Sequence, residues 1–285
     1  MMKRRTALGI LAGAAGAASL PLAARTAEAK DPAHAAFDPA NPAHVALAFR
    51  KLAWSMDDSL TFHWLHGTRY GVQGSLLTPF WEMHVATWFK VRDLGEGRYE
   101  VRSAGANFYT LPGEAKLLEK FNNPYTGETV DVPYGAPRAM TAVYDATGGA
   151  PFPDMPGMKT THKADLGPAW IEGDEVRVRG DNFMHAEPNE PGKKSFTVQD
   201  MSTYVGKIAD IMSPKVKNPP AQHMFNDVLD FPKYLKMGDQ PGTYFSRCYG
   251  RKVYRYADMP ATWRALFEGR FPVIAKDPGA LLAAK

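Results

Sequence analysis

The feature that most restricts the fold of this chain is a series of short runs rich in aromatic and β-branched residues, with turn-forming residues between them. Three such runs occupy residues 60–72, 80–91 and 98–111, and the short 94–97 link between the last two is a hairpin signal. Residues 175–179 alternate apolar and charged side chains, which is typical of a strand with one polar face. Further candidate strands cover residues 117–121, 129–132, 195–198, 202–208 and 243–256. Many short strands joined by turns predict a mainly β domain, an antiparallel β-barrel or half-barrel of lipocalin-like form with short helical caps.

Two segments have the pattern of helices that cap such a sheet. From Pro42 to about Trp54, apolar side chains recur at the i, i+3, i+4 and i+7 spacing of one helix face. Residues 260–269 form a second candidate helix near the end of the chain. The proline-punctuated, aromatic segment 214–242 predicts a long covering loop, with a short helix around residues 225–229.

Residues 1–29 have the order of a secretory signal peptide. A Lys-Arg-Arg cluster is followed by an apolar, small-residue run over 7–24 and a small-residue site that ends at Ala29. The paired arginines favour the twin-arginine route, with the general secretory route as the alternative. The run is rich in alanine and glycine and is broken by Pro21, which argues against a membrane anchor. We therefore expect cleavage after Ala29, one periplasmic domain over residues 30–285 and no stable membrane association after cleavage.

Charge and cysteine content exclude several partners and cofactors. The whole chain has a formal net charge of +4, but the expected signal peptide carries four basic residues and one acidic residue, so the mature chain is close to neutral. No block of lysine and arginine remains in it, which argues against a nucleic-acid partner. The single cysteine, Cys248, excludes an internal disulfide and a multi-cysteine zinc site. Because no dinucleotide fingerprint, phosphate-binding loop or nucleophile elbow occurs, we expect no nucleotide or redox cofactor.

Histidine and glutamate residues gather on two neighbouring candidate strands. Glu82 and His84 are two residues apart and point to the same face of a strand, where the carboxylate raises the basicity of the imidazole. We predict His84, supported by Glu82, as a catalytic general base, with His63 and His66 beside them inside the barrel as substrate-binding residues. The alternative is that these are interior side chains hydrogen-bonded for stability. A metal site on His63, His66 and either His84 or Glu82 is a further alternative. The spacing of His63 and His66 suits a helix better than a strand, so we expect no metal ion.

Other polar and aromatic residues complete the predicted pocket. Arg247, Tyr249 and Arg251 alternate along one face of a candidate strand, and arginines that face a pocket bind phenolate or carboxylate groups. On an outward face they would be ordinary solvated charges. We predict Arg247, together with Tyr204 from another candidate strand, as catalytic. Tyr249, Arg251 and Trp88 are predicted to bind substrate.

Three stretches of sequence carry a family resemblance. Residues 62–72 form an aromatic run that ends in Gly-Thr-Arg-Tyr-Gly-Val, and residues 123–132 read Asn-Pro-Tyr-Thr-Gly-Glu-Thr-Val-Asp-Val. Residues 236–243 read Lys-Met-Gly-Asp-Gln-Pro-Gly-Thr, followed by Gly-Arg-Lys at 250–252. With the spacing between them, these stretches resemble the bacterial exported family known as domain of unknown function 1838, over most of residues 45–270.

A weaker resemblance is to cofactor-free lyases of lignin-dimer catabolism in sphingomonads, although this sequence departs from the usual pattern by having Met83-His84 after Glu82. The resemblance implies a periplasmic, cofactor-independent lyase that takes a small aromatic molecule and releases formaldehyde from a phenylcoumaran-type dimer. For that reaction we assign the alcohol proton to His84, protonation of the departing aryl ether oxygen to Tyr204, and stabilisation of the phenolate to Arg247. The alternatives are a lipocalin-like binding protein for an apolar ligand and a metal-assisted hydrolase.

Overall fold

The computed structural model describes residues 37–145, 157–190 and 193–283, so the predicted signal peptide at 1–29 lies outside the described part of the chain. β-Strands are the predominant secondary structure of the described chain. The strands are β1 (Thr61–Gln73), β2 (Leu76–Gly95), β3 (Arg98–Thr110), β4 (Lys120–Asn122), β5 (Thr129–Asp131), β6 (Met140–Tyr144), β7 (Met158–Leu166), β8 (Trp170–Glu172), β9 (Glu175–Pro188), β10 (Phe196–Lys207), β11 (Gln222–Leu229) and β12 (Thr243–Val253). The helices are α2 (Pro42–Ala53), α3 (Ile208–Met212), α4 (Ala261–Arg270) and α5 (Pro272–Lys276), with short 3₁₀ turns η1 (Lys233–Leu235), η2 (Tyr256–Asp258) and η3 (Pro278–Leu282).

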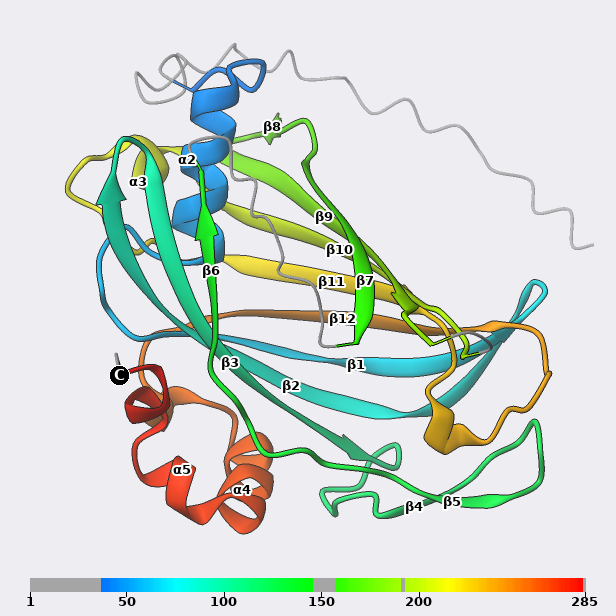
Figure 1. Cartoon of the computed structure of the whole chain (residues 1–285). Helices are drawn as coiled ribbons and strands as arrows, with labels where there is room; N and C mark the ends of the chain where they lie inside the picture. The colour runs from blue at the N-terminus through cyan, green and yellow to red at the C-terminus, as the bar shows by residue number, and fades with distance from the viewer. Residues whose placement is uncertain (1–36, 146–156, 191–192, 284–285) are drawn as a thin grey trace, which may run out of the picture. The chain divides into compact units, whose positions relative to one another are not determined.

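Ten of the strands form one antiparallel sheet. Nine of them follow the order β6–β3–β2–β1–β12–β11–β10–β9–β7, and β8 pairs with β9. Strands β4 and β5 form a separate two-stranded hairpin. Figure 1 shows the large sheet curled into a half-barrel, with α2 beside one of its faces. The predicted mainly β class, the half-barrel and the short helical caps are therefore confirmed.

One helix holds the two ends of the curled sheet together. The ring of Trp54, at the end of α2, lies 5.6 Å from Tyr99 of β3, while Phe49 of α2 lies 5.6 Å from Tyr204 of β10. A single hydrophobic cluster joins α2 to β2, β3, β9 and β10. Because strands from opposite ends of the sheet contact the same helix, the sheet curls around it. We call this concave side the inner face and the opposite side the outer face.

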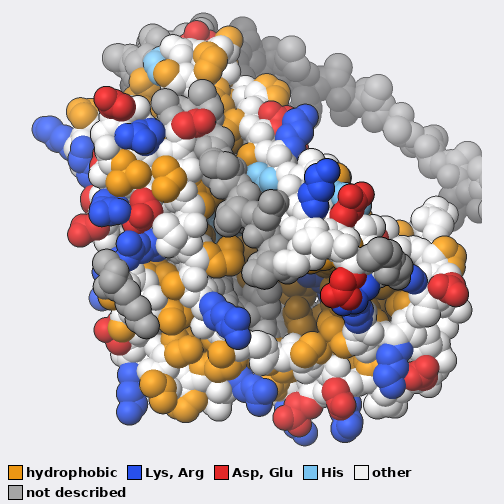
Figure 2. Space-filling view, in the orientation of Figure 1, with side chains coloured by type: hydrophobic (Ala, Val, Ile, Leu, Met, Phe, Trp, Pro, Cys, Tyr) orange, Lys and Arg blue, Asp and Glu red, His pale blue; other side chains and the backbone are white. Residues whose placement is uncertain are grey.

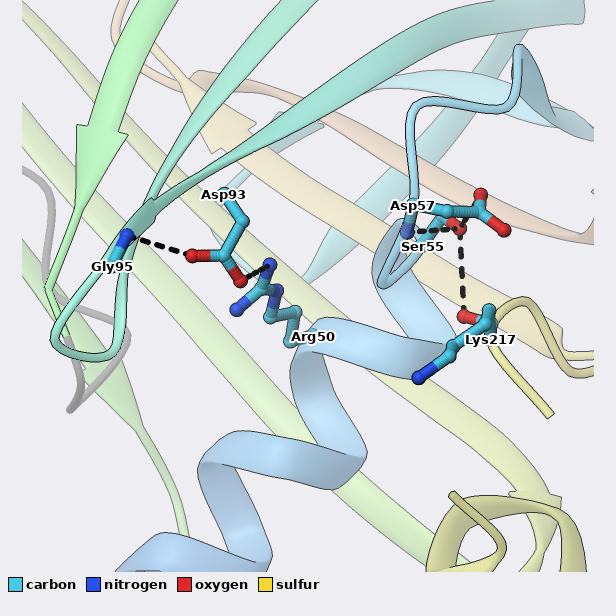
Figure 3. Close-up of polar contacts among 6 residues, drawn as sticks. All are labelled: Arg50, Ser55, Asp57, Asp93, Gly95 and Lys217. Carbon is cyan, nitrogen blue, oxygen red and sulfur yellow. Dashed lines mark hydrogen bonds and ion pairs between the residues drawn. The ribbon is translucent and has the colours of Figure 1, made fainter. Parts of the chain in front are cut away.

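Polar contacts anchor the C-terminal end of α2 to two neighbouring segments (Figure 3). The Arg50 guanidinium donates to the Asp93 carboxylate of β2 at 3.2 Å, and Asp93 also accepts from the backbone N–H of Gly95 at 2.8 Å. Beyond the helix, the Ser55 hydroxyl donates to Asp57 at 2.7 Å and lies 3.4 Å from the carbonyl oxygen of Lys217. The helix is thereby tied to the β2–β3 hairpin on one side and to the segment before β11 on the other.

The outer face of β1–β3 is covered by the C-terminal helices. The indole of Trp88 is fully buried and lies 5.6 Å from Phe267 of α4, and Phe108 lies 6.0 Å from Trp263. On the inner face, the β4–β5 hairpin and η1 cover the part of the sheet that lies away from α2. Their side chains pack against the sheet in a second cluster that is rich in aromatic residues. Among the described residues, no helix is both long enough and apolar enough to cross a membrane.

The close approach of strands β1 and β12 depends on two glycine residues. A Cβ atom on Gly67 would lie 1.9 Å from the carbonyl oxygen of Arg247, and one on Gly250 would lie 1.8 Å from that of Trp64. Each contact is with backbone, which cannot move aside without breaking the strand pairing. Both glycines therefore permit a close strand approach that any side chain would prevent.

Replacement of Gly67 by alanine is expected to lower the free energy of unfolding by about 3 kcal/mol, because the methyl group forces β1 and β12 apart. Gly135→Ala is the matched control, since a Cβ there meets nothing within 4 Å. Urea denaturation measures both variants. Equal stability of the two variants would contradict this account of the curl.

Several predicted elements are confirmed and one is wrong. Helices α2 and α4 and the β2–β3 hairpin agree with the predictions. Residues 225–229, predicted as a short helix in a covering loop, belong instead to strand β11, which pairs with β10 and β12. Runs 195–198 and 202–208, predicted as separate strands, are largely parts of the continuous strand β10. Strands β6, β7 and β8 were not predicted.

Candidate functional site

The predicted site residues are divided between the two faces of the sheet. Along a strand, side chains alternate between faces, so residues three apart lie on opposite sides. His63 is paired with Thr87 and His66 with His84, which puts His63 on the inner face and His66 on the outer face. The expectation of one histidine–glutamate cluster inside the barrel is therefore corrected: His66, Glu82 and His84 share the outer face, and His63 lies behind them.

The outer group is a compact set of polar side chains on β1 and β2. His66 Nε2 lies 3.5 Å from a carboxylate oxygen of Glu82, and the rings of His66 and His84 are 4.7 Å apart. His84 Nε2 is 3.2 Å from the hydroxyl of Thr110 on β3. Burial and the neighbouring His66 together lower the pKa of His84 to about 4, against the opposing effect of Glu82. His84 is therefore neutral at pH 7.

The predicted residues of β12 also lie on the outer face. Arg247, Tyr249 and Arg251 are all exposed, and Tyr249, which is 65% exposed, is the cross-strand neighbour of His66. Trp88 is different, because it is fully buried under α4 and its indole N–H donates to the carbonyl of Pro278 at 2.9 Å. Its predicted role in substrate binding is thus replaced by a role in the core between the sheet and the C-terminal helices.

On the inner face, His63 lies among aromatic side chains near the end of α2. His63 is 5.6 Å from Tyr204 and 5.0 Å from His223, and the rings of Tyr204 and His223 are stacked at 4.3 Å. Burial lowers the pKa of His223 to about 3 and raises the pKa of Tyr204. His223 Nε2 is paired with the hydroxyl of Ser202 at 3.2 Å. These groups are neutral at physiological pH and offer hydrogen bonds without charge.

A row of polar residues that the sequence did not single out crosses four strands of the inner face. Arg69 of β1, Ser246 of β12, Asp227 of β11 and Asp200 of β10 occupy successive paired positions; we call them the polar row. The Arg69 guanidinium donates to Asp227, which also accepts from the backbone N–H of Ser246 at 3.0 Å and from its hydroxyl at 2.7 Å. Burial opposes the charge of Arg69, but Asp227 holds the pKa of Arg69 above its ordinary value.

Asp200 is the titratable member of the polar row. Burial and the neighbouring charge of Asp227 together raise the pKa of the Asp200 carboxyl to about 7, against the opposing effect of Arg69. The described residues provide Asp200 with no hydrogen-bond or ion-pair partner, whereas Asp227 is fully engaged by Arg69 and Ser246. The two carboxyl groups thus have different surroundings: Asp227 is held in an ion pair with Arg69, and Asp200 exchanges its proton near neutral pH.

Tyrosines surround the arginine end of the polar row. The Arg69 guanidinium lies over the ring of Tyr244 at 4.2 Å, and the hydroxyls of Tyr244 and Tyr234 are 3.2 Å apart. Burial raises the pKa of Tyr109, and the charge of Arg69 opposes this rise. All three tyrosines stay protonated at pH 7 and remain hydrogen-bond donors.

Part of the inner face is open to solvent. Gly105 and Asn107, on the inner side of β3, are exposed although the alternate residues on the outer side are buried. A pocket between α2 and β7, β9 and β10 is lined in part by Asn182, Ser202 and Tyr204. Asn182 is the strand partner of Asp200, so the polar row ends at this pocket. Figure 2 shows this side of the molecule hollowed near its centre, with hydrophobic side chains along the recess.

Comparison with known proteins identifies one family. The sequence model of a family described as protein of unknown function (DUF1838) matches residues 71–284. No curated protein matches the chain. The matched range includes β2, β10, β11 and β12, and therefore three of the four members of the polar row.

Proposed function

Because the chain belongs to the DUF1838 family, whose description assigns no activity, we propose its function from the inner face: a cofactor-independent lyase that uses acid–base catalysis on a small aromatic molecule. We also propose that residues 1–29 direct export, so that the reaction takes place in the periplasm. N-terminal sequencing of the protein from the periplasmic fraction tests the export, with a mature chain starting at Lys30 as the expected result.

The observation that carries the proposal is the unpartnered carboxyl of Asp200 beside a pocket. A general base works best when its pKa is near the working pH, and burial next to Asp227 gives the Asp200 carboxyl a pKa of about 7. Arg69 supplies a buried positive charge in the same row. A base, a buried cation in the same row and a neutral tyrosine donor, Tyr204, in the neighbouring aromatic-lined pocket support acid–base chemistry on an aromatic substrate.

The proposed reaction is loss of formaldehyde from a phenylcoumaran-type dimer that carries a primary alcohol. Asp200 removes the alcohol proton, and the freed O–H electron pair forms the carbonyl of formaldehyde as the adjacent carbon–carbon bond breaks. That bonding pair forms a new carbon–carbon double bond and expels the aryl ether oxygen as a phenolate. Protonated Asp200 returns its proton to the phenolate, so the products are formaldehyde and a stilbene-type phenol. No oxidant or reductant is consumed.

The remaining roles follow from position. Tyr204 lines the pocket and, as a neutral phenol, donates a hydrogen bond to the departing oxygen. Arg69 stabilises the negative charge that develops on the phenolate. His84 and Arg247, the base and the cation expected from the sequence, lie on the outer face, where the sheet separates them from Tyr204. The proposal therefore moves both roles to the polar row.

The mature protein is expected to release formaldehyde and the stilbene in equal amounts from such a dimer. The same dimer with its primary alcohol methylated is the control substrate, since it has no proton for Asp200 to remove. Formaldehyde is measured by derivatisation and the stilbene by absorbance. If neither dimer reacts but aromatic ligands quench the tryptophan fluorescence, the protein is a binding protein and the lyase proposal is wrong.

A further inference from the structure

The side chains of His66, Glu82 and His84 form a group that we call the outer-face cluster. From this cluster we infer that the protein binds one zinc ion through these three residues. This site lies on the opposite side of the sheet from the polar row and does not depend on the proposed lyase activity. It also differs from the metal site considered from the sequence, because His63 points away from it to the inner face.

The three side chains offer ligand atoms that already lie close together. One nitrogen from each histidine and one carboxylate oxygen of Glu82 are all within 4.8 Å of one another. The described residues hold no other group of three or more histidine, cysteine or acidic side chains this close. Contraction of these separations by up to about 1.5 Å brings the three atoms to the mutual distances of a tetrahedral zinc site, whose ligand bonds are about 2.0–2.2 Å.

The sheet holds the three residues in a fixed arrangement. His66 and His84 are directly paired across β1 and β2, and Glu82 lies two residues before His84 on the same face. Both strands are central, because β12 pairs with β1 and β3 pairs with β2. The fully buried hydroxyl of Thr110 is 3.2 Å from the ring of His84 and orients it, which is the role of an outer-shell partner of a metal ligand.

The chemistry of the ligand set favours zinc. Two imidazoles and one carboxylate suit a borderline divalent ion better than calcium or magnesium, which prefer oxygen ligands. The side chains of His66 and Glu82 are 30% and 27% exposed, so the cluster is open to solvent on one side. A zinc ion there keeps a coordination position for water or for an anionic ligand.

A second histidine–glutamate pair provides a matched comparison within the same chain. His185 Nε2 lies 3.5 Å from Glu187, the same separation as between His66 and Glu82, and His185 is exposed to a similar degree. Among the residues that the structure describes, no third histidine, cysteine or acidic side chain accompanies this pair. It therefore reproduces the ion pair of the outer-face cluster without the metal site.

The test is zinc binding by the full mature protein. After treatment with a chelator and buffer exchange, calorimetric titration with zinc chloride at pH 7.5 is expected to show one ion per chain. His84→Ala, His66→Ala and Glu82→Gln should each weaken binding by at least about a hundredfold, while His185→Ala should bind as the parent does. Glu82→Gln keeps the size of the side chain, so its loss of binding is not explained by misfolding.

Cobalt provides a second readout that needs no variant. Co²⁺ bound by two imidazoles, a carboxylate and water gives visible absorption bands of four-coordinate intensity, and addition of zinc should abolish them. Absence of zinc binding by the parent, or zinc binding undiminished in Glu82→Gln and His84→Ala, would overturn the inference and leave the three residues as a surface hydrogen-bonded cluster. None of these outcomes depends on formaldehyde release.

Discussion

Replacement of Arg69 by methionine is expected to lower the free energy of unfolding by about 3–5 kcal/mol, measured by urea denaturation at pH 7.5. The side chains of Arg69 and Asp227 are only 6% and 10% exposed, and they form a direct ion pair. Methionine keeps the apolar contact with the ring of Tyr244 but removes the charge. The carboxylate of Asp227 then stays buried with only Ser246 as a partner, which is far more costly than losing both charges together.

Two further variants separate this effect from a general loss of an arginine. Arg92→Met removes an arginine that is 64% exposed and paired with Glu100 at 3.0 Å, and we expect a cost of at most about 1 kcal/mol. The double variant Arg69→Met/Asp227→Asn should be more stable than Arg69→Met alone, because the buried charge is gone. If Arg69→Met costs no more than Arg92→Met, the polar row does not hold the inner face together.

Strands β1 and β12 were predicted from the sequence, whereas β11, whose inner side is polar, was not. In β1 and β12 more buried and less buried residues alternate over most of the strand, so the period of two is visible along the chain. In β11 the inner side carries His223 and Asp227, while Met224 on the outer side is 40% exposed. A buried aspartate and an exposed methionine reverse the usual pattern, and the segment was predicted as a helix within a loop.

The sequence predicted only those features of the site that depend on residue spacing along a single strand. The shared face of Glu82 and His84 follows from their spacing of two residues and is confirmed by their strand partners Thr68 and His66. The same rule separates His63 from His66, although the sequence prediction grouped them. The polar row needs more than this rule. Arg69 and Asp227 are 158 positions apart, and their contact depends on the register of strands whose pairing the sequence does not show.

Replacement of Asp200 by asparagine is expected to reduce formaldehyde release by about 10²–10⁴-fold, because the amide has the size of the carboxyl group but cannot accept the alcohol proton. Activity of the parent should rise with pH through about 7, since the base must be ionised and burial raises the pKa of Asp200 to that value. Asp58→Asn is the control, because Asp58 is an exposed aspartate and should keep full activity.

Asp200→Asn is expected to lower activity but to raise the stability of the folded protein. This difference distinguishes loss of the general base from loss of the fold. The pKa of Asp200 is about 7 in the folded state and near 4 in the unfolded state, so the folded protein binds the extra proton between these values. Stability of the parent therefore falls as pH rises from about 4 to 7, and Asp200→Asn removes this loss. We expect the variant to be inactive yet more stable than the parent at pH 8.

A variant that is inactive and less stable than the parent would indicate a structural role for Asp200. Full activity of the variant would show that another residue is the general base. If His84→Ala abolishes turnover while Asp200→Asn does not, the base lies on the outer face, as the sequence first suggested.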